Sequence, residues 1–142
     1  MKRMPVERFI DTNVLLYAYD RTAGRKRKIA LEIVEEGWIS PGSNAVSVQV
    51  LQEFYVNFAR SGQSHKTASQ IIEDLSQWPV VDNTLERFGQ GLEFCRRFKT
   101  SLWDAMVLSA AKFSGATQLL TEDLNHGQDY FGIEVVNPFI KT

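Results

Sequence analysis

Four acidic residues lie in apolar stretches of the sequence, where an ionised side chain is costly to bury. They are Asp11 in FIDTNVLLYAYD, Glu53 in SVQVLQEFYVNF, Asp104 in SLWDAMVLSAAK and Asp123 in QLLTEDLNHGQDY. An unpaired charge inside a protein costs several kcal/mol unless a proton or an opposite charge neutralises it. Each of these carboxylates therefore needs a partner, and one partner shared by all four is a solution.

A divalent cation is the natural partner for clustered carboxylates. Without one, neighbouring carboxylates repel and raise one another's pKa. Oxygen ligands of this kind favour Mg²⁺ or Mn²⁺. The two histidines and one cysteine of the chain are too few for a typical zinc site. If the fold brings the four acids together, their chemistry predicts a magnesium or manganese site.

The turn around Asp11 also has a simpler interpretation as a helix cap. Asp, Thr and Asn are favoured where a chain leaves a strand and enters a helix. Thr12 or Asn13 could cap a helix that begins at Val14. This stretch alone favours a cap, and the other three acids shift the interpretation of Asp11 toward a metal ligand. A cap at Asn13 stays open.

The other three acids have local alternatives as well. Glu53 borders the apolar stripe of an amphipathic helix and could be solvated. Ser101 precedes Asp104 by three residues, as in a capping box, although Asp is a poorer partner than Glu in that motif. Asp123 could close an Asx turn, with Thr121 as a rival capping residue. Each acid is a weak signal alone, and the four together predict a shared site.

The elements that must position these acids alternate between short apolar runs and amphipathic helices. This pattern predicts a single α/β domain with a central, mainly parallel sheet of about five strands flanked by helices. The expected strands are residues 7–10, 44–46, 79–81, 118–120 and 134–136, and the expected helices are residues 14–19, 26–36, 47–60, 66–77, 84–97 and 102–114. Because Asp11 and Asp123 follow strands, both should lie where ligands collect, beyond the carboxyl ends of the sheet.

Composition narrows the class of protein. The chain has 142 residues, of which 44% are hydrophobic and 23% charged, as in ordinary soluble domains. With 16 Lys and Arg against 17 Asp and Glu, the net charge of -1 argues against nonspecific coating of nucleic acid and leaves room for a local binding track. A single cysteine, no signal-peptide core and no membrane-length apolar run predict a cytoplasmic protein.

The sequence resembles PIN-domain ribonucleases, most closely the VapC-type toxins of toxin–antitoxin systems. The resemblance spans residues 1–142 as one PIN domain and rests on FIDTNVLLYAYD, SVQVLQEFYVNF, SLWDAMVLSAA and LLTEDLNHG followed by VVNPF. It implies a Mg²⁺- or Mn²⁺-dependent endoribonuclease, a homodimer and a small antitoxin that blocks the active groove. The family's acidic site falls on Asp11, Glu53, Asp104 and Asp123.

The resemblance also implies roles for single residues. Asn13 and Thr121 would be polar helpers of the acids. From the chemistry of phosphodiester hydrolysis we hypothesise that Asp11 and Asp104 make the main metal contacts, directly or through water molecules. Glu53 and Asp123 would hold a second ion or orient the attacking water. Hydrolysis by water in this family leaves a 5′-phosphate and a 3′-hydroxyl without using the ribose 2′-OH.

An acidic site needs basic residues nearby to bind an RNA backbone. RTAGRKRK, residues 21–28, contains five basic and no acidic residues, and it fits a solvated surface as well as it fits RNA contact. Arg96, Arg97 and Lys99 precede the helix of Asp104, and this position favours RNA contact for them. Such contacts would make binding dependent on salt and independent of base sequence.

Two other functions are compatible with the same residues. The chain could be a noncatalytic RNA- or protein-binding module whose acids only cap and turn the backbone, or a related metal-dependent DNA nuclease. All four positions carry Asp or Glu, which are residue types that bind metal ions, and this argues against the noncatalytic module. Trp38, Trp78 and Trp103 are predicted to be core anchors and not base-stacking platforms.

Overall fold

A six-stranded sheet with the order β3-β2-β1-β4-β6-β5 forms the centre of the computed structural model, which describes residues 5–140. Neighbouring strands are parallel except in the β5–β6 hairpin. The strands are Arg8–Ile10 (β1), Asn44–Ser47 (β2), Val80–Val81 (β3), Gln118–Leu120 (β4), Asp129–Tyr130 (β5) and Ile133–Val136 (β6).

The order of the strands reverses at β1. From β1 the chain moves outward to β2 and then to β3, and it later returns to β4 on the opposite side of β1. In open α/β sheets, ligands bind beyond the carboxyl ends of the strands at such a switch point. Asp11 directly follows β1 and Thr121 directly follows β4, so both residues lie at this point.

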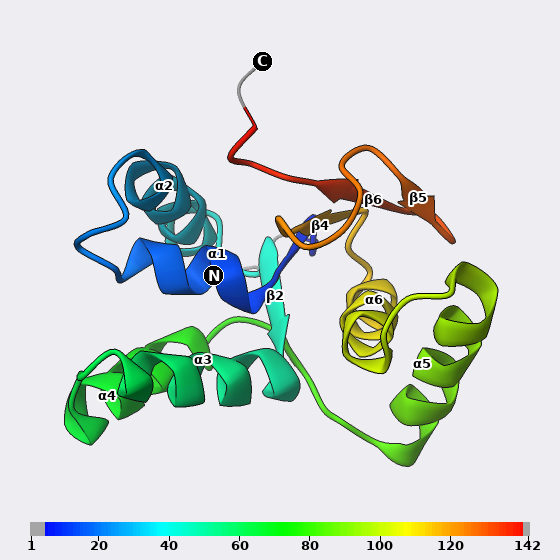
Figure 1. Ribbon diagram of the computed structural model, residues 1–142, viewed down its shortest axis with the longest axis horizontal. Helices are drawn as coiled ribbons and strands as arrows, with labels where there is room; N and C mark the ends of the chain where they lie inside the picture. The colour runs from blue at the N-terminus through cyan, green and yellow to red at the C-terminus, as the bar shows by residue number, and fades with distance from the viewer. Residues whose placement is uncertain (1–4, 141–142) are drawn as a thin grey trace.

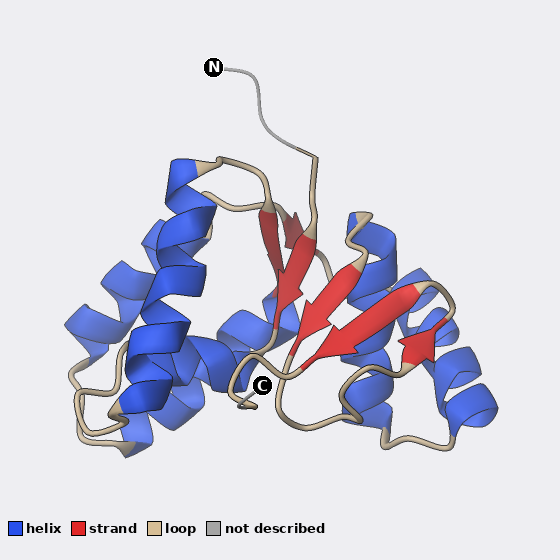
Figure 2. Cartoon of the chain, turned by 90° about the horizontal axis from the view of Figure 1, so that it is seen from above, coloured by secondary structure: helices blue, strands red, loops and turns tan. Residues whose placement is uncertain are grey.

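Helices lie on both sides of the sheet (Figure 2). On one side, α6 packs against β1 to β4 and β6, and α5 packs against α6. On the other side, α1 contacts α2 and α3, and α4 packs against α3 (Figure 1). Within residues 5–140 no helix has both the length and the apolar character that a membrane span needs. The helices are Thr12–Ala18 (α1), Arg25–Ile39 (α2), Val48–Arg60 (α3), His65–Leu75 (α4), Leu85–Phe98 (α5) and Leu102–Ser114 (α6).

Apolar side chains from the short strands and the inner helix faces build the core. Phe9 and Leu119 of the central strands, Leu15 of α1, Phe54 of α3 and Leu108 of α6 are completely buried. Burying a side chain of this size contributes about 1.5–3 kcal/mol. The core therefore holds both helical layers rigidly against the strands that end at the acidic residues.

Hydroxyl side chains fix where several helices begin. Ser47, Ser64, Thr84 and Ser101 are the N-caps of α3, α4, α5 and α6, and each accepts a hydrogen bond from the backbone N–H three residues further on. Such caps stabilise a helix by about 1 kcal/mol. They set the phase of α3 and α6, and with it the directions of Glu53 and Asp104.

The predicted α/β fold with a mainly parallel sheet is confirmed, but the sheet has six strands and not about five. The strand that the prediction missed is β5, which has only two residues. Phe131 and Gly132 join it to β6, and both have positive φ angles, of 52° and 91°. Two-residue hairpins with this backbone usually carry Asn-Gly or Asp-Gly, so Phe-Gly did not signal a turn.

The tryptophan prediction is right at only one of the three positions. Trp78 is buried, and its ring lies 5.2 Å from that of Trp38. Trp38 is 41% exposed and Trp103 is 66% exposed, so neither anchors the core. Trp103 lies in the first turn of α6, before the buried stretch of that helix begins at Ala105.

Candidate active site

Asp11 connects the end of β1 to the start of α1. Its backbone N–H donates to the Leu120 carbonyl at 3.1 Å, which holds the ends of β1 and β4 together. One carboxylate oxygen accepts from the Thr12 N–H and the other from the Thr121 hydroxyl, both at 2.8 Å. The residue is buried, with 6% of its surface exposed.

The helix-cap prediction for this turn named the wrong residue as the N-cap. The helix α1 begins at Thr12, not at Val14, and its N-cap is Asp11. Asp, Thr and Asn are all common N-cap residues, so residue type alone could not decide among these three neighbouring positions. Both oxygens of Asp11 accept hydrogen bonds, but each carboxylate oxygen has a further lone pair, so capping and metal binding are compatible at this carboxylate.

Asn13 bridges the segments that follow β1 and β4. Its side-chain nitrogen contacts the Asp123 carboxylate at 3.0 Å, the Thr121 hydroxyl at 3.1 Å and the Asp11 carboxylate at 3.4 Å. Its side-chain oxygen accepts from the Glu122 N–H at 3.4 Å. The amide therefore sets the spacing between Asp11 and Asp123, and it does not cap a helix.

Glu53 projects from α3 and is held by two neighbours. The Thr12 hydroxyl donates to one carboxylate oxygen at 3.3 Å, and the Gln49 amide donates to the other at 2.8 Å. The same amide lies 3.4 Å from the Trp103 carbonyl, which links α3 to the first turn of α6. Gln49 was not among the predicted site residues, although it lies one helical turn before Glu53, at a spacing typical of interacting side chains.

Asp104 is partly buried in the first turn of α6. The Ser101 hydroxyl accepts from its backbone N–H at 3.1 Å, so the cap expected from the sequence is present. This bond comes from the backbone of Asp104. The Ser101 side chain also forms a hydrogen bond with the Asp104 carboxylate, which lowers the pKa of Asp104 against the larger effect of burial. Burial raises the pKa of Asp104, and the carboxylates of Asp123 and Glu53 raise it further.

The acids interact electrostatically. Burial raises the pKa of Asp11 to about 6, against hydrogen bonds from Thr12 and Thr121 that favour the ionised form. Asp123 and Glu53 also raise this pKa. In the part of the chain from residue 5 to residue 140, none of the four predicted acids forms a salt bridge. No lysine or arginine of the described residues therefore neutralises these carboxylates through an ion pair.

The donor types fit a hard divalent cation, although the carboxylates do not form a ready-made cage. Among the described residues, no group of three or more His, Cys, Asp or Glu side chains is arranged to hold a metal ion. Carboxylates without a cation are pushed apart by their charge, and at Asp11 hydrogen bonds take up both oxygens. Carboxylate oxygens are ligands that magnesium and manganese prefer, and a bound cation would favour the ionised form of Asp11 against the burial that raises its pKa.

The basic residues predicted to contact RNA lie at the C-terminal end of α5. Arg96 forms an ion pair with Glu93, and the Arg97 guanidinium lies 5.6 Å from the centre of the Phe98 ring. Lys99 is the C-cap of the helix, with a φ of 54°. Their contact with RNA stays a prediction.

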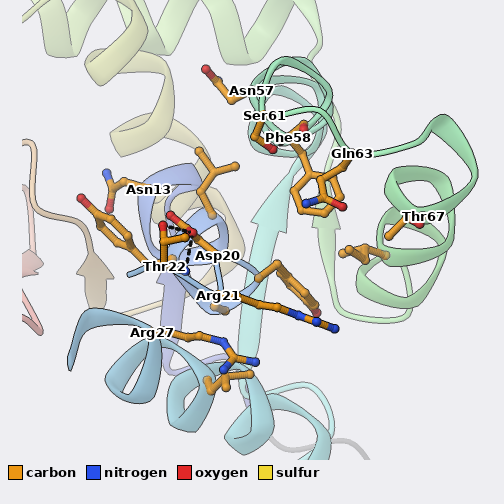
Figure 3. A pocket seen from close by; sticks show the side chains of 16 residues that line it. Asn13, Asp20, Arg21, Thr22, Arg27, Asn57, Phe58, Ser61, Gln63 and Thr67 are labelled. Carbon is orange, nitrogen blue, oxygen red and sulfur yellow. Dashed lines mark hydrogen bonds between the residues drawn. The ribbon is translucent and has the colours of Figure 1, made fainter. Parts of the chain in front are cut away.

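A groove of about 1050 Å³ lies between α1 and α2 on one side and α3 and α4 on the other. Its walls include Arg21 and Arg27 from the first basic segment (Figure 3). Asn13 also lines it, whereas none of the four acids does. The groove therefore borders the acidic site at Asn13 and carries basic residues further along its walls.

The sequence matches the PIN domain family over residues 8–128, and the chain belongs to this family. The fold is that of several solved toxin structures. A toxin–antitoxin complex from Klebsiella pneumoniae superposes with a TM-score of 0.70 at 22% identity, covering 94% of this chain and 98% of the other. VapC20 of Mycobacterium tuberculosis, a toxin that cleaves the sarcin–ricin loop, gives 0.60 at 20% identity, with 82% and 92% covered.

A third structure with this fold is VapBC2 of Rickettsia felis bound to a DNA fragment from its promoter. It superposes with a TM-score of 0.60 at 18% identity, covering 92% of this chain and 97% of the other. No curated protein sequence matches this chain. The comparisons thus define the family and the fold, while the chemistry of this chain has to be argued from its own residues.

Asn13→Asp is expected to destabilise the folded protein by about 1–3 kcal/mol at pH 7.5, because it replaces a bridging donor with a third carboxylate. Repulsion raises the pKa of the new carboxyl group, so the loss should be smallest near pH 4. Urea unfolding at both pH values measures the effect. Asn125→Asp, in an exposed loop, is the matched control, and an equal loss there would contradict a bridging role for Asn13.

Proposed function

We propose that the chain is a Mg²⁺- or Mn²⁺-dependent endoribonuclease and the VapC-type toxin of a toxin–antitoxin pair. The observation that carries the proposal is Asp11, a buried carboxylate with a raised pKa in a group of acids that lack a basic partner within residues 5–140. A hard cation would neutralise this group. Membership of the PIN domain family supports the nuclease, and the likeness in fold to toxin structures supports the toxin role.

In this proposal Asp11 and Asp104 make the main contacts to the ion, and Glu53 and Asp123 complete the site. When bound, the ion supplies positive charge that acidifies water and polarises the phosphoryl oxygens of the substrate. Asn13 holds the carboxylates that follow β1 and β4 at a fixed spacing. The chain thus places its acids before substrate binds, which lowers the cost of organising them in the transition state.

Two other groups keep the acids in their rotamers. The Thr121 hydroxyl donates to Asp11, and the Gln49 amide donates to Glu53 while contacting the backbone of α6. Partners of this kind typically change metal affinity or activity by about 10–100-fold when they are removed. Gln49 and Thr121 are therefore supporting residues of the proposed site.

RNA and an antitoxin are the proposed partners. Arg21 and Arg27 beside the groove, and Arg96, Arg97 and Lys99 on α5, would neutralise backbone phosphates and give salt-dependent binding. Two of the solved structures with this fold are toxin–antitoxin complexes, which supports a small antitoxin partner. A homodimer and a cytoplasmic location belong to the same proposal.

RNA cleavage in the presence and absence of metal tests the function. We expect the purified protein with Mg²⁺ or Mn²⁺ to cut at least one of a panel of structured RNAs, including a sarcin–ricin loop, and to leave 5′-phosphate ends. EDTA should stop the reaction, and added Mn²⁺ should restore it. Intact RNA under every metal condition, or cleavage that EDTA does not affect, would contradict the proposal.

A substrate with a single 2′-deoxy nucleotide at the cleavage site is the control for contaminating ribonucleases. Because water is the proposed nucleophile, this substrate should still be cut, whereas enzymes that use the 2′-OH cannot cut it. Single-stranded DNA of the same sequence should be cut poorly. Equal cleavage of DNA would favour a DNA nuclease instead.

A further inference from the structure

Glu122 lies between two residues of the proposed site but points away from it. The Thr121 hydroxyl and the Asp123 carboxylate face Asn13, which bonds to both. The Glu122 carboxylate instead meets Tyr17 of α1 and Lys26 of α2. Residues 122–124 form a bend, and their hydrogen bonds show that this segment presents Thr121 and Asp123 to Asn13 and Glu122 to the helices α1 and α2.

The contacts of Glu122 form a closed set. One carboxylate oxygen accepts from the Tyr17 hydroxyl, and the other accepts from the Lys26 ammonium at 2.9 Å. The Lys26 ammonium also lies 3.3 Å from the Tyr17 hydroxyl. All three side chains therefore contact one another, and we refer to Tyr17, Lys26 and Glu122 as the β4-loop clamp.

Aromatic packing fixes the cationic member of the clamp. The Lys26 ammonium lies 4.7 Å from the centre of the Tyr17 ring and 5.5 Å from that of Phe139. These rings pack edge to face at 5.1 Å, and the Arg25 guanidinium donates to the Phe139 carbonyl at 2.9 Å. Phe139 is buried, so the segment after β6 supports the clamp from the far side.

The electrostatics of the clamp differ from those of the acidic site beside it. The Tyr17 hydroxyl and the Lys26 ammonium both donate to the Glu122 carboxylate, and the ammonium neutralises its charge. Glu122 is thus an acid with a cationic partner, directly next to acids without one. Its side chain is 22% exposed, so water screens the pair only in part. A charge that is already paired suits a residue that holds structure better than one that binds a metal ion.

We infer that the β4-loop clamp positions Asp123, with Glu122 as the positioning residue, and that its release loosens the proposed metal site. The inference rests on the proposed function for its metal and on the contacts of Glu122 for its geometry. The backbone path is short: the Glu122 N–H donates to the Asn13 side chain, and the next residue is Asp123. Movement of Glu122 therefore shifts both ends of the Asn13–Asp123 hydrogen bond.

Glu122→Gln tests the inference because it removes the charge and keeps the size of the side chain. Calorimetric titration with Mn²⁺ is expected to give an affinity about 10-fold weaker than that of the wild type, the usual effect of losing a group that orients a ligand. In the metal-free protein, backbone hydrogen exchange at Glu122 and Asp123 should become faster. Lys26→Met should produce the same changes, and the double variant should be less than additive.

Glu86→Gln is the matched control, since Glu86 also pairs with a basic residue, Arg87 at 3.2 Å, and lies on α5, away from β4. It should leave Mn²⁺ affinity and hydrogen exchange after β4 unchanged. Unchanged exchange at Glu122 and Asp123 in Glu122→Gln would overturn the clamp, whether or not the protein binds metal. Faster exchange with unaltered Mn²⁺ affinity would overturn the positioning role. Wild-type protein that binds no Mn²⁺ would overturn the proposed function instead, and hydrogen exchange would still decide the clamp.

Discussion

Asp11→Asn is expected to abolish RNA cleavage and, without metal, to raise the free energy of unfolding at pH 7.5. Burial holds the pKa of Asp11 at about 6, compared with 3.8 for a free side chain. Because one pKa unit corresponds to about 1.4 kcal/mol, an ionised Asp11 costs the folded state up to about 3 kcal/mol. The neutral amide avoids that cost and can still accept from the Thr12 N–H.

The effect of Asp11→Asn on stability should depend on pH in a defined direction. A carboxyl group whose pKa is higher in the folded state stabilises the protein while it is protonated, and this stabilisation is lost as the pH rises through the folded pKa. The advantage of the variant should therefore be absent below about pH 4, grow between pH 4 and about pH 6, and stay constant above. Urea unfolding at pH 4, 5, 6 and 7.5 measures it.

Mn²⁺ should make the wild type more stable than Asp11→Asn, the reverse of the order expected without metal. Mn²⁺ bound only to the folded wild type raises its unfolding temperature, whereas the variant has lost a main ligand and gains little. Asp82→Asn, an exposed position after β3, is the control and should change neither activity nor stability. Full activity in Asp11→Asn would exclude Asp11 from the reaction, and a less stable variant would make helix capping its main role.

The sequence located the acids correctly relative to the sheet because two local patterns agreed. Asp11 and Asp123 each follow a short apolar run, and these runs are β1 and β4, which pair in parallel. Parallel strands end at the same edge of a sheet, so the strand ends identified from the sequence are enough to predict that the two residues lie close together. The predicted bounds of β4 and α6 match the structure, since buried apolar residues fill both elements.

Contacts between elements could not be read in the same way. The Gln49 amide joins Glu53 to the backbone of α6, and Lys26 reaches Glu122 across 96 positions in the chain. Periodicity describes which face of a helix is buried, but it does not say which polar side chain of another element lies opposite. The segment around Lys26 was read as a block of basic charge, while the structure gives one of its lysines an acidic and two aromatic neighbours.

Acidic residues of the proposed site lie where the strand order of the sheet reverses. Both the N-cap of α1 and the residues after β4 lie at that point, and the Asp11 N–H crosses it to bond with the Leu120 carbonyl. Rigid strands thus carry Asp11 and Thr121, whereas Asp123 lies in a loop that is held by side chains. We therefore expect the position of Asp123 to depend more on neighbouring side chains than the position of Asp11 does.

Asp104→Asn is expected to lower RNA cleavage by at least about 100-fold, since loss of a direct ligand should exceed the effect of losing a residue that only orients one. Its stability without metal should rise slightly, because burial and the carboxylates of Asp123 and Glu53 raise the pKa of Asp104 by more than the hydrogen bond from Ser101 lowers it. The N-cap of α6 survives the substitution, because the bond to the Ser101 hydroxyl comes from the backbone of Asp104. Cleavage rates at saturating Mn²⁺ and thermal unfolding measure the two effects.

Ser101→Ala separates the cap from the ligand at the same turn. It removes the hydroxyl that caps α6, together with that hydroxyl's hydrogen bond to the Asp104 side chain, and keeps the Asp104 carboxylate itself. The expected cost is about 1 kcal/mol of stability. Below its unfolding temperature this variant should still cleave RNA with the same metal requirement, whereas Asp104→Asn should be folded and inactive. If Ser101→Ala lost as much activity as Asp104→Asn while both remained folded, the carboxylate would act through the start of the helix and not through a metal ion. The opposite pattern, a stable Asp104→Asn without activity beside a weakened but active Ser101→Ala, is the result that a metal-binding Asp104 requires.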